Sequence, residues 1–147
     1  MSRYLYQTVG AIAVAVTASL SLSVSSHAQQ SAESIVPPEE KPFWGSAQAF
    51  VDAYAKRDAT AIGDLFTEDA EFYDEFGEQT NGRDAIVAMF QDVFDSAAEA
   101  VVDEIRIERV RHVTEAVALE EGVVISTEFA NGPRYQSRYV ALHTKGE

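Results

Sequence analysis

The sequence is organised around the stretch LFTEDAEFYDEFG at residues 65–77. It predicts the end of a helix, then a strand, then a turn at Gly77. Because strand side chains point alternately to two faces, every second residue shares a face. The acid on the mostly apolar face is either a strand-end residue that caps the turn or a desolvated acid with a chemical role. That face carries Ala70, Phe72, Asp74 and Phe76.

The first 28 residues have the pattern of a cleaved signal peptide. Arg3 gives a positive start, residues 9–24 are an apolar run, and small residues at Ser26 and Ala28 favour cleavage after Ala28. A membrane anchor is the alternative, but the run is short and diluted by Ser and Thr. We therefore expect an exported protein, periplasmic or secreted. The predicted division is residues 1–28 as signal peptide, 29–42 as disordered leader and 43–147 as the folded domain.

The composition excludes several classes of partner. The chain has 11 Lys and Arg against 24 Asp and Glu, a formal net charge of -13. Nucleic acids and anionic membranes attract basic residues, so we expect neither as a partner after signal cleavage. Without Cys, stability must come from the core. No metal-type histidine spacing, glycine-rich phosphate loop or nucleophile elbow occurs, so no metal or cofactor is expected.

Apolar periodicity predicts three helices followed by a run of antiparallel strands. Residues 43–56 and 83–94 carry apolar side chains at helical spacing, and Asp58 can cap a short helix between them. From Ala100 the period changes to two, with a phase slip at residues 103–104 that indicates a bulge. Later strands are expected at residues 113–119, 123–129 and 135–144, with a break near 120–122 and a hairpin turn at Asn131-Gly132.

This order predicts an α+β domain in which the helices cover one face of a strongly curved antiparallel sheet. Such a cup leaves a cone-shaped cavity, a usual place for a small ligand. His143 shares a face of the last strand with Tyr139. It is either a proton carrier that works with Asp74 or a surface histidine near the end of the strand.

Several motifs resemble the nuclear-transport-factor-2-like superfamily, above all its SnoaL-like members and the SgcJ/EcaC group. They are AYAKRD at residues 53–58, LFTEDAEF at 65–72, Gly77 and GRDAI at 82–86. The resemblance implies a cone-shaped helix–sheet fold, which hosts isomerases, dehydratases, cyclases and plain binding modules. It also implies one more strand, so the last strand is expected to be missing. The exposed edge would then associate with another chain, unless a dimer partner or the leader fills the gap.

The same resemblance suggests roles for individual residues. Asp74 falls where ketosteroid isomerases keep their general-base Asp, and Phe50 falls where they keep an oxyanion-hole Tyr. Their second oxyanion donor, an acid on a late strand, has no counterpart between Arg134 and Thr144. A base without such partners does not stabilise a dienolate, so the resemblance supports the cavity more than the isomerase reaction.

We therefore expect a domain that binds a small, mostly apolar molecule in the helix–sheet cavity. The alternatives are an isomerase, dehydratase or cyclase with Asp74 as general base, and a non-catalytic dimerisation module. The open sheet face carries Val, Ile and Tyr between Arg and Glu, so a homodimer through that face is also expected. The aromatic residues that line the cavity, or else simply form the core, are Phe50, Tyr54, Phe66, Phe72, Phe76, Phe90 and Phe94.

Overall fold

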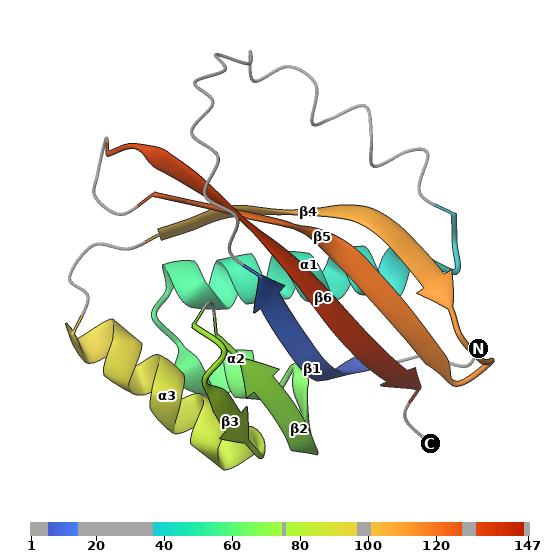
Figure 1. The fold of residues 1–147 in the computed structure, drawn as a ribbon, viewed down its shortest axis with the longest axis horizontal. Coiled ribbons are helices and arrows are strands. Elements are labelled where there is room, and N and C mark those ends of the chain that lie inside the picture. Colours follow the sequence, from blue (N-terminus) through green and yellow to red (C-terminus); the bar gives the residue numbers. More distant parts are fainter. Residues whose placement is uncertain (1–5, 15–36, 75, 97–100, 128–131, 146–147) are drawn as a thin grey trace.

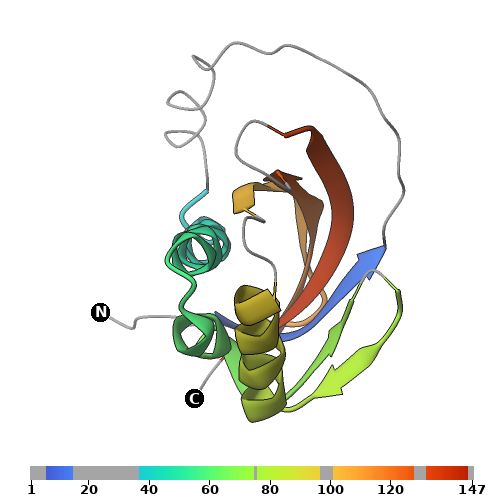
Figure 2. The same cartoon turned by 90° about the vertical axis from the view of Figure 1, so that its left-hand side faces the viewer.

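The computed structural model describes residues 6–14, 37–74, 76–96, 101–127 and 132–145, with the backbone alone for residues 6–14. The fold is α+β, as predicted, with helices on one side of a largely antiparallel sheet (Figures 1 and 2). Among the described residues, no helix is long and apolar enough to cross a membrane. Residues 1–5 and 15–28 of the predicted signal peptide, residues 29–36 of the predicted leader and Asn131 of the predicted hairpin lie outside the described ranges.

Three helices lie where the apolar periodicity places them. They are α1 (Lys41–Ala55), α2 (Ala59–Gly63) and α3 (Arg83–Ser96). Asp58 caps α2 as predicted, because its side chain accepts a hydrogen bond of 2.9 Å from the backbone N–H of Ala61. Gly82 precedes α3 with a φ of 85°, a left-handed conformation that glycine adopts without strain.

Within the ranges that the structure describes, six strands form one sheet in the order β3-β2-β1-β6-β5-β4. All neighbours are antiparallel except β1 and β2, which are parallel. The phase slip predicted at residues 103–104 is confirmed, because the pairing of β4 with β5 shifts register between Val102 and Glu104. The strands are β1 (Tyr6–Val14), β2 (Phe66–Tyr73), β3 (Gln79–Asn81), β4 (Val101–His112), β5 (Val117–Thr127) and β6 (Arg134–Lys145).

The edge of β6 that the sequence predicted to be exposed is covered by β1. Residues 6–14 belong to the predicted signal peptide, yet they pair antiparallel with β6 and parallel with β2. Ile12, for example, lies opposite Val140 on one side and opposite Tyr73 on the other. This stretch can fill the position because it contains nine uncharged residues, enough for a strand of ordinary length.

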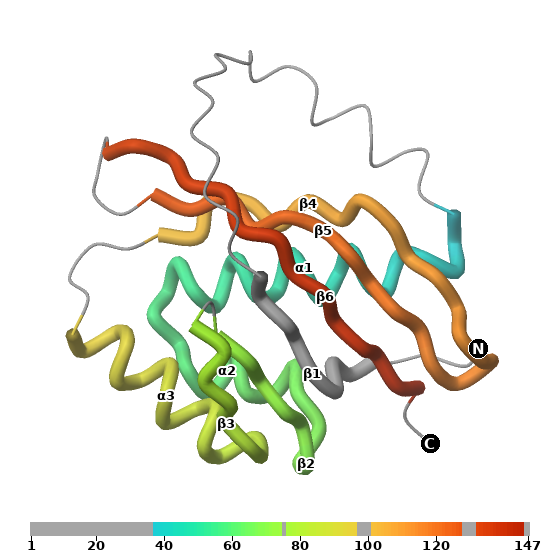
Figure 3. The backbone as a smooth tube through the Cα atoms, viewed as in Figure 1, coloured from blue at the N-terminus to red at the C-terminus, as the bar shows by residue number. Residues whose placement is uncertain are grey.

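The break predicted near residues 120–122 is wrong, because β5 runs through it without interruption and pairs with β6 from Val117 to Thr127 (Figure 3). Two adjacent glutamates and a glycine resembled a turn. In the strand, Glu120 is buried on one face and Glu121 is half-buried on the other. The glycine is needed for packing, as described below.

Among the described residues, the core has two main parts. The larger part joins the three helices to β2 and includes Ile62, Phe66, Ile86 and Phe90. The smaller part lies where the first half of α1 crosses β4 and β5, and its buried members are Phe43, Ala47, Ile107 and Ala118. This smaller part forms the apolar surroundings of the candidate site.

Candidate functional site

Asp74 lies in the turn between β2 and β3. Its Oδ1 accepts hydrogen bonds from the backbone N–H groups of Phe76 and Glu78, each 2.8 Å long. This is the turn-capping role, one of the two alternatives that the sequence leaves open for Asp74. The carboxylate is half-buried and binds its own loop.

The sheet register separates Asp74 from His143. Tyr73, the residue before Asp74, lies opposite Ile12 of β1. His143 of β6 lies opposite Thr8, which is nearer the start of β1, and β6 pairs with the other edge of that strand. The structure therefore does not bring these two predicted residues together.

The predicted aromatic residues pack against one another as core, with the exception of Phe76. Phe90 contacts Phe50 with ring centroids 5.7 Å apart and Phe72 with centroids 5.6 Å apart, and Tyr54 contacts Phe94 at 5.0 Å. Phe66 belongs to the same cluster. Phe76 is 83% exposed, because the turn after Asp74 ends the strand alternation that placed it on the inner face.

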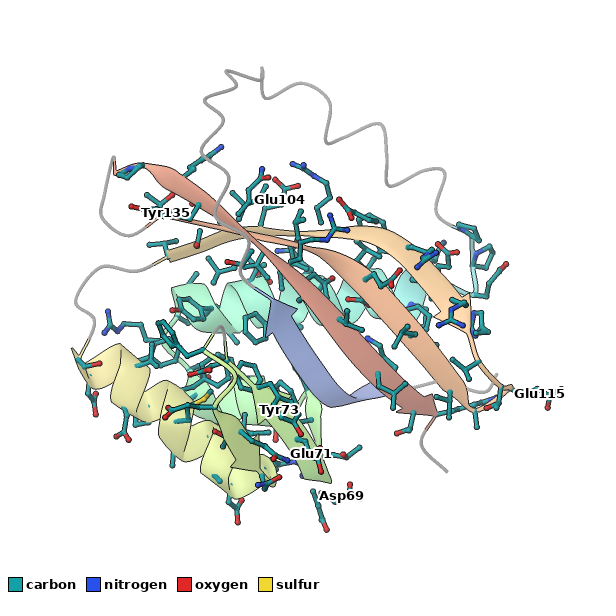
Figure 4. The ribbon with its side chains drawn as sticks, in the orientation of Figure 1. Asp69, Glu71, Tyr73, Glu104, Glu115 and Tyr135 are labelled. Carbon is teal, nitrogen blue, oxygen red and sulfur yellow. The ribbon has the colours of Figure 1, made fainter. Side chains whose placement is uncertain are left out.

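The acidic residues of β2 face solvent. Asp69 and Glu71 are exposed and project away from the domain, and the Tyr73 hydroxyl donates to Glu71 over 3.1 Å (Figure 4). Among the described residues, no group of three or more Asp, Glu, His or Cys side chains is placed to hold a metal ion.

A different group of polar side chains is buried on the face of β5 and β6 that α1 covers. We call Glu120, Tyr139 and His143 the buried polar cluster; their exposed fractions are 3%, 9% and 2%. The Tyr139 hydroxyl donates a hydrogen bond of 2.6 Å to Oε1 of Glu120. Nε2 of His143 lies 3.2 Å from the other carboxylate oxygen, Oε2. Tyr135, near the start of the same strand, is 44% exposed (Figure 4).

Cross-strand pairing brings the cluster together. His143 lies opposite Ala118 and Tyr139 lies opposite Gly122, with Glu120 between the two pairs on the same face of β5. A Cβ atom at Gly122 would clash with the backbone oxygen of Arg106 on β4, and it would also lie only 2.8 Å from Cε1 and 2.9 Å from the hydroxyl oxygen of Tyr139. The tyrosine ring can therefore lie over the glycine and extend its hydroxyl to Glu120 because no side chain occupies that position.

The first half of α1 covers the cluster with aromatic side chains. Phe43 is fully buried and meets the His143 ring edge to face, with centroids 5.0 Å apart and an interplanar angle of 81°. Trp44, the only tryptophan of the chain, packs against the apolar group that includes Phe43, Ala47 and Ile107. The polar cluster is thus enclosed in mostly apolar surroundings.

The electrostatics of the cluster leave hydrogen-bonding capacity unused. Burial raises the pKa of Tyr139, and the charge and hydrogen bond of Glu120 raise it further, so the phenol stays protonated and donates a hydrogen bond to Glu120. Within the described part of the chain, Oε2 of Glu120, both ring nitrogens of His143 and Nε1 of Trp44 have no hydrogen-bond partner. Glu120 and His143 are close enough for electrostatic contact, but their facing atoms are not aligned for a hydrogen bond.

Sequence comparison gives the family. The profile of the SnoaL-like domain matches residues 47–146, more than half of the chain. This chain belongs to the SnoaL-like domain family. Its resemblance to the nuclear-transport-factor-2-like superfamily is thereby confirmed, while assignment to the SgcJ/EcaC group stays a prediction. No curated protein matches the sequence.

Solved structures support the fold of this SnoaL-like domain. It is similar to a domain of unknown function with a cystatin-like fold from Nostoc punctiforme, with 22% identity, a TM-score of 0.69, and 76% of this chain and 71% of that chain covered. A ketosteroid isomerase-like protein from Erwinia carotovora atroseptica has 18% identity, a TM-score of 0.56, and coverage of 76% and 87%. A protein of unknown function from Shewanella oneidensis, described as NTF-2 like, has 12% identity, a TM-score of 0.59, and coverage of 71% and 85%.

Sequence reasoning found one member of the buried polar cluster and misplaced it. The sequence places His143 either beside Asp74 or at the surface, and both placements are wrong because it is 2% exposed and lies next to Glu120. Glu120 was missed because Glu-Glu-Gly resembled a break between strands. The signal that could have found it is the alternation Ala118, Glu120, Gly122, which places one acid between two small residues on a single face of a strand.

Proposed function

We propose that this SnoaL-like domain binds a small, mostly apolar molecule between α1 and the sheet, with Glu120 and His143 contacting its polar group. The observation that carries the proposal is the buried polar cluster, whose carboxylate and imidazole retain atoms without hydrogen-bond partners among the described residues. Burying such groups costs about 1–3 kcal/mol for each missing partner. A ligand that supplies those partners would recover this cost, while Phe43, Trp44 and Ile107 would contact its apolar part.

Access to the cluster requires the first turns of α1 to move, since Phe43 and His143 are both enclosed. Two features lower the stability of this end of the helix. Glu40 at the N-cap position makes no side-chain hydrogen bond to the described helix, whereas a good cap contributes about 1 kcal/mol. Gly45 in the second turn lowers helix stability further, by about 1 kcal/mol relative to Ala. The start of α1 is therefore the part of the cover that we expect to open.

The fluorescence of Trp44 and the thermal stability of the full chain provide the test. We expect a panel of small hydrophobic molecules to include ligands that raise the unfolding temperature in proportion to their concentration and change the emission of Trp44. Phe43→Ala should weaken these ligands, while Glu121→Gln on the opposite face of β5 should bind them as the wild type does. If no molecule of the panel moves either signal, the proposed binding site is wrong.

A second candidate is a proton-transfer enzyme of the isomerase, dehydratase or cyclase kind. The observation that favours it is the 2.6 Å hydrogen bond from Tyr139, which orients the Glu120 carboxylate and leaves its second oxygen beside an imidazole. In this version Glu120 is the base in place of Asp74, whose Oδ1 is engaged by two backbone N–H groups. Glu120→Gln should then abolish turnover while Asp74→Asn retains it; the opposite pattern would restore Asp74 as the base.

A further inference from the structure

We infer that the polar group of the ligand is a hydroxyl, held between Oε2 of Glu120 and Nε2 of His143, so that the ligand class is a small, mainly apolar alcohol. This inference rests on the proposed binding site and specifies the chemistry of what binds there.

The unpaired atoms of the buried polar cluster call for a ligand group that both donates and accepts hydrogen bonds. Oε1 of Glu120 already receives the Tyr139 hydroxyl, and Oε2 can only accept. The imidazole offers an N–H donor. Oε2 and Nε2 lie 3.2 Å apart without the alignment of a hydrogen bond, so neither satisfies the other. One hydroxyl can donate to Oε2 and accept from the imidazole at the same time.

Other polar groups fit these two atoms less well. A ketone only accepts, so it leaves Oε2 without a donor. A carboxylate or phosphate would place a second negative charge beside Glu120 in a buried site, which the net charge of -13 disfavours further. A protonated amine can donate to Oε2 but has no lone pair to accept the imidazole N–H. A hydrocarbon leaves both atoms without partners.

The test uses four molecules with one rigid bicyclic skeleton: bornane, camphor, borneol and bornylamine. They differ only in carrying no polar group, a ketone, a hydroxyl or an amine. Affinities are measured on the wild-type full chain from Trp44 fluorescence and checked by thermal shift. We expect borneol to bind about tenfold more tightly than bornane, because it gains a hydrogen bond to a charged acceptor. Camphor should bind between bornane and borneol, because its carbonyl accepts from the imidazole but leaves Oε2 without a donor, and bornylamine should bind less tightly than borneol.

Two adjacent glutamates supply matched variants. Glu121→Gln changes the carboxylate on the opposite face of β5 and should keep the wild-type order of affinities. Glu120→Gln replaces Oε2 by an N–H donor while its amide oxygen can still accept from Tyr139. Its preference should therefore move from borneol towards camphor, while bornane keeps its affinity. The wild-type series needs no variant to fold, so it decides the inference by itself.

The outcomes separate this inference from the proposed function. If borneol, camphor and bornane bind equally well to the wild type, the hydroxyl inference is overturned and the apolar binding site stands. If bornylamine binds most tightly, the polar group is a cation and the inference is likewise overturned. If none of the four molecules binds, the proposed site itself is rejected.

Discussion

The carboxylates of Asp74 and Glu120 both accept hydrogen bonds, but from different kinds of donor. Asp74 receives two backbone N–H groups of its own turn, and Glu120 receives the phenol of a neighbouring strand. The first arrangement stabilises local chain geometry. The second holds a carboxylate inside apolar surroundings, where unsatisfied charge is costly. The two carboxylates thus differ in their surroundings, because Asp74 is half-buried in a turn and Glu120 is 3% exposed between the helix and the sheet.

Tyr139→Phe tests the hydrogen bond within the buried polar cluster. Removing the hydroxyl leaves Oε1 of Glu120 without its donor, so we expect the free energy of unfolding to fall by about 1–3 kcal/mol at neutral pH. The folded state raises the pKa of this tyrosine, so it binds the phenolic proton more tightly than the unfolded state does. Wild-type stability should therefore fall as pH rises above about 10. The difference in free energy of unfolding between the wild type and Tyr139→Phe should then narrow. Denaturant titrations from neutral to alkaline pH measure this; a gap that stays constant would contradict it.

Asp74→Ala should remove the two hydrogen bonds that organise the turn before β3. We expect a loss of about 1–2 kcal/mol in the free energy of unfolding, as for a lost capping side chain. Asp74→Asn keeps an acceptor oxygen and should lose less. Neither variant should change the affinity of ligands that alter Trp44 fluorescence. A weakened ligand with an unchanged fold would show that Asp74 contributes to binding.

At the scale of elements, the first half of α1 covers the buried polar cluster and also contains a residue that lowers helix stability. It places Phe43 against His143, yet it also contains Gly45, which is exposed and where an added Cβ atom would meet nothing within 4 Å. Gly45→Ala should therefore stabilise the protein by about 0.5–1 kcal/mol without a clash. If α1 must open for a ligand to reach Glu120, the association rate should fall by about two- to fivefold. Stopped-flow fluorescence of Trp44 gives the association rate. A raised denaturation midpoint with an unchanged association rate would mean that another element controls access to the site.

At the scale of the whole molecule, residues 6–14 cannot both be removed with a signal peptide and remain as β1. The signal pattern predicts cleavage after Ala28 on export, and the shortened chain would lose the ladders of β1 with β2 and β6. We therefore expect residues 29–147 to unfold at a lower denaturant concentration than the full chain. Mass spectrometry of the exported protein and paired denaturation curves measure the two effects. An intact N-terminus after export, or equal midpoints, would contradict them.

The sheet face away from α1 is the expected site of a homodimer. Val140 and Leu142 lie half-buried there, beside ion pairs between Arg138 and Glu108 and between Arg109 and Glu121. An apolar face edged with charges suits a two-fold interface. Light scattering at micromolar concentration should give a dimer mass, and Val140→Glu should convert it to a monomer. A monomer mass for the wild type would refute the interface.

Sequence alone determined the elements whose signals are local. The helical spacing of apolar residues placed α1 and α3, Asp58 indicated the start of α2, and the change of phase at residues 103–104 indicated the bulge in β4. These features depend on neighbours within a few residues, so a single chain segment carries the whole signal.

Only the tertiary structure decided the candidate site. Alternation placed Tyr139 and His143 on one face of β6, but it did not say whether that face meets α1 or solvent. The burial of Glu120 depends on Tyr139 from the next strand, on the empty position at Gly122 and on Phe43 from a distant helix. The place of β1 depends on edges offered by β2 and β6, which are far apart in the sequence. A residue's partners across a sheet are set by strand order and register, and neither is encoded in the local pattern of any one strand.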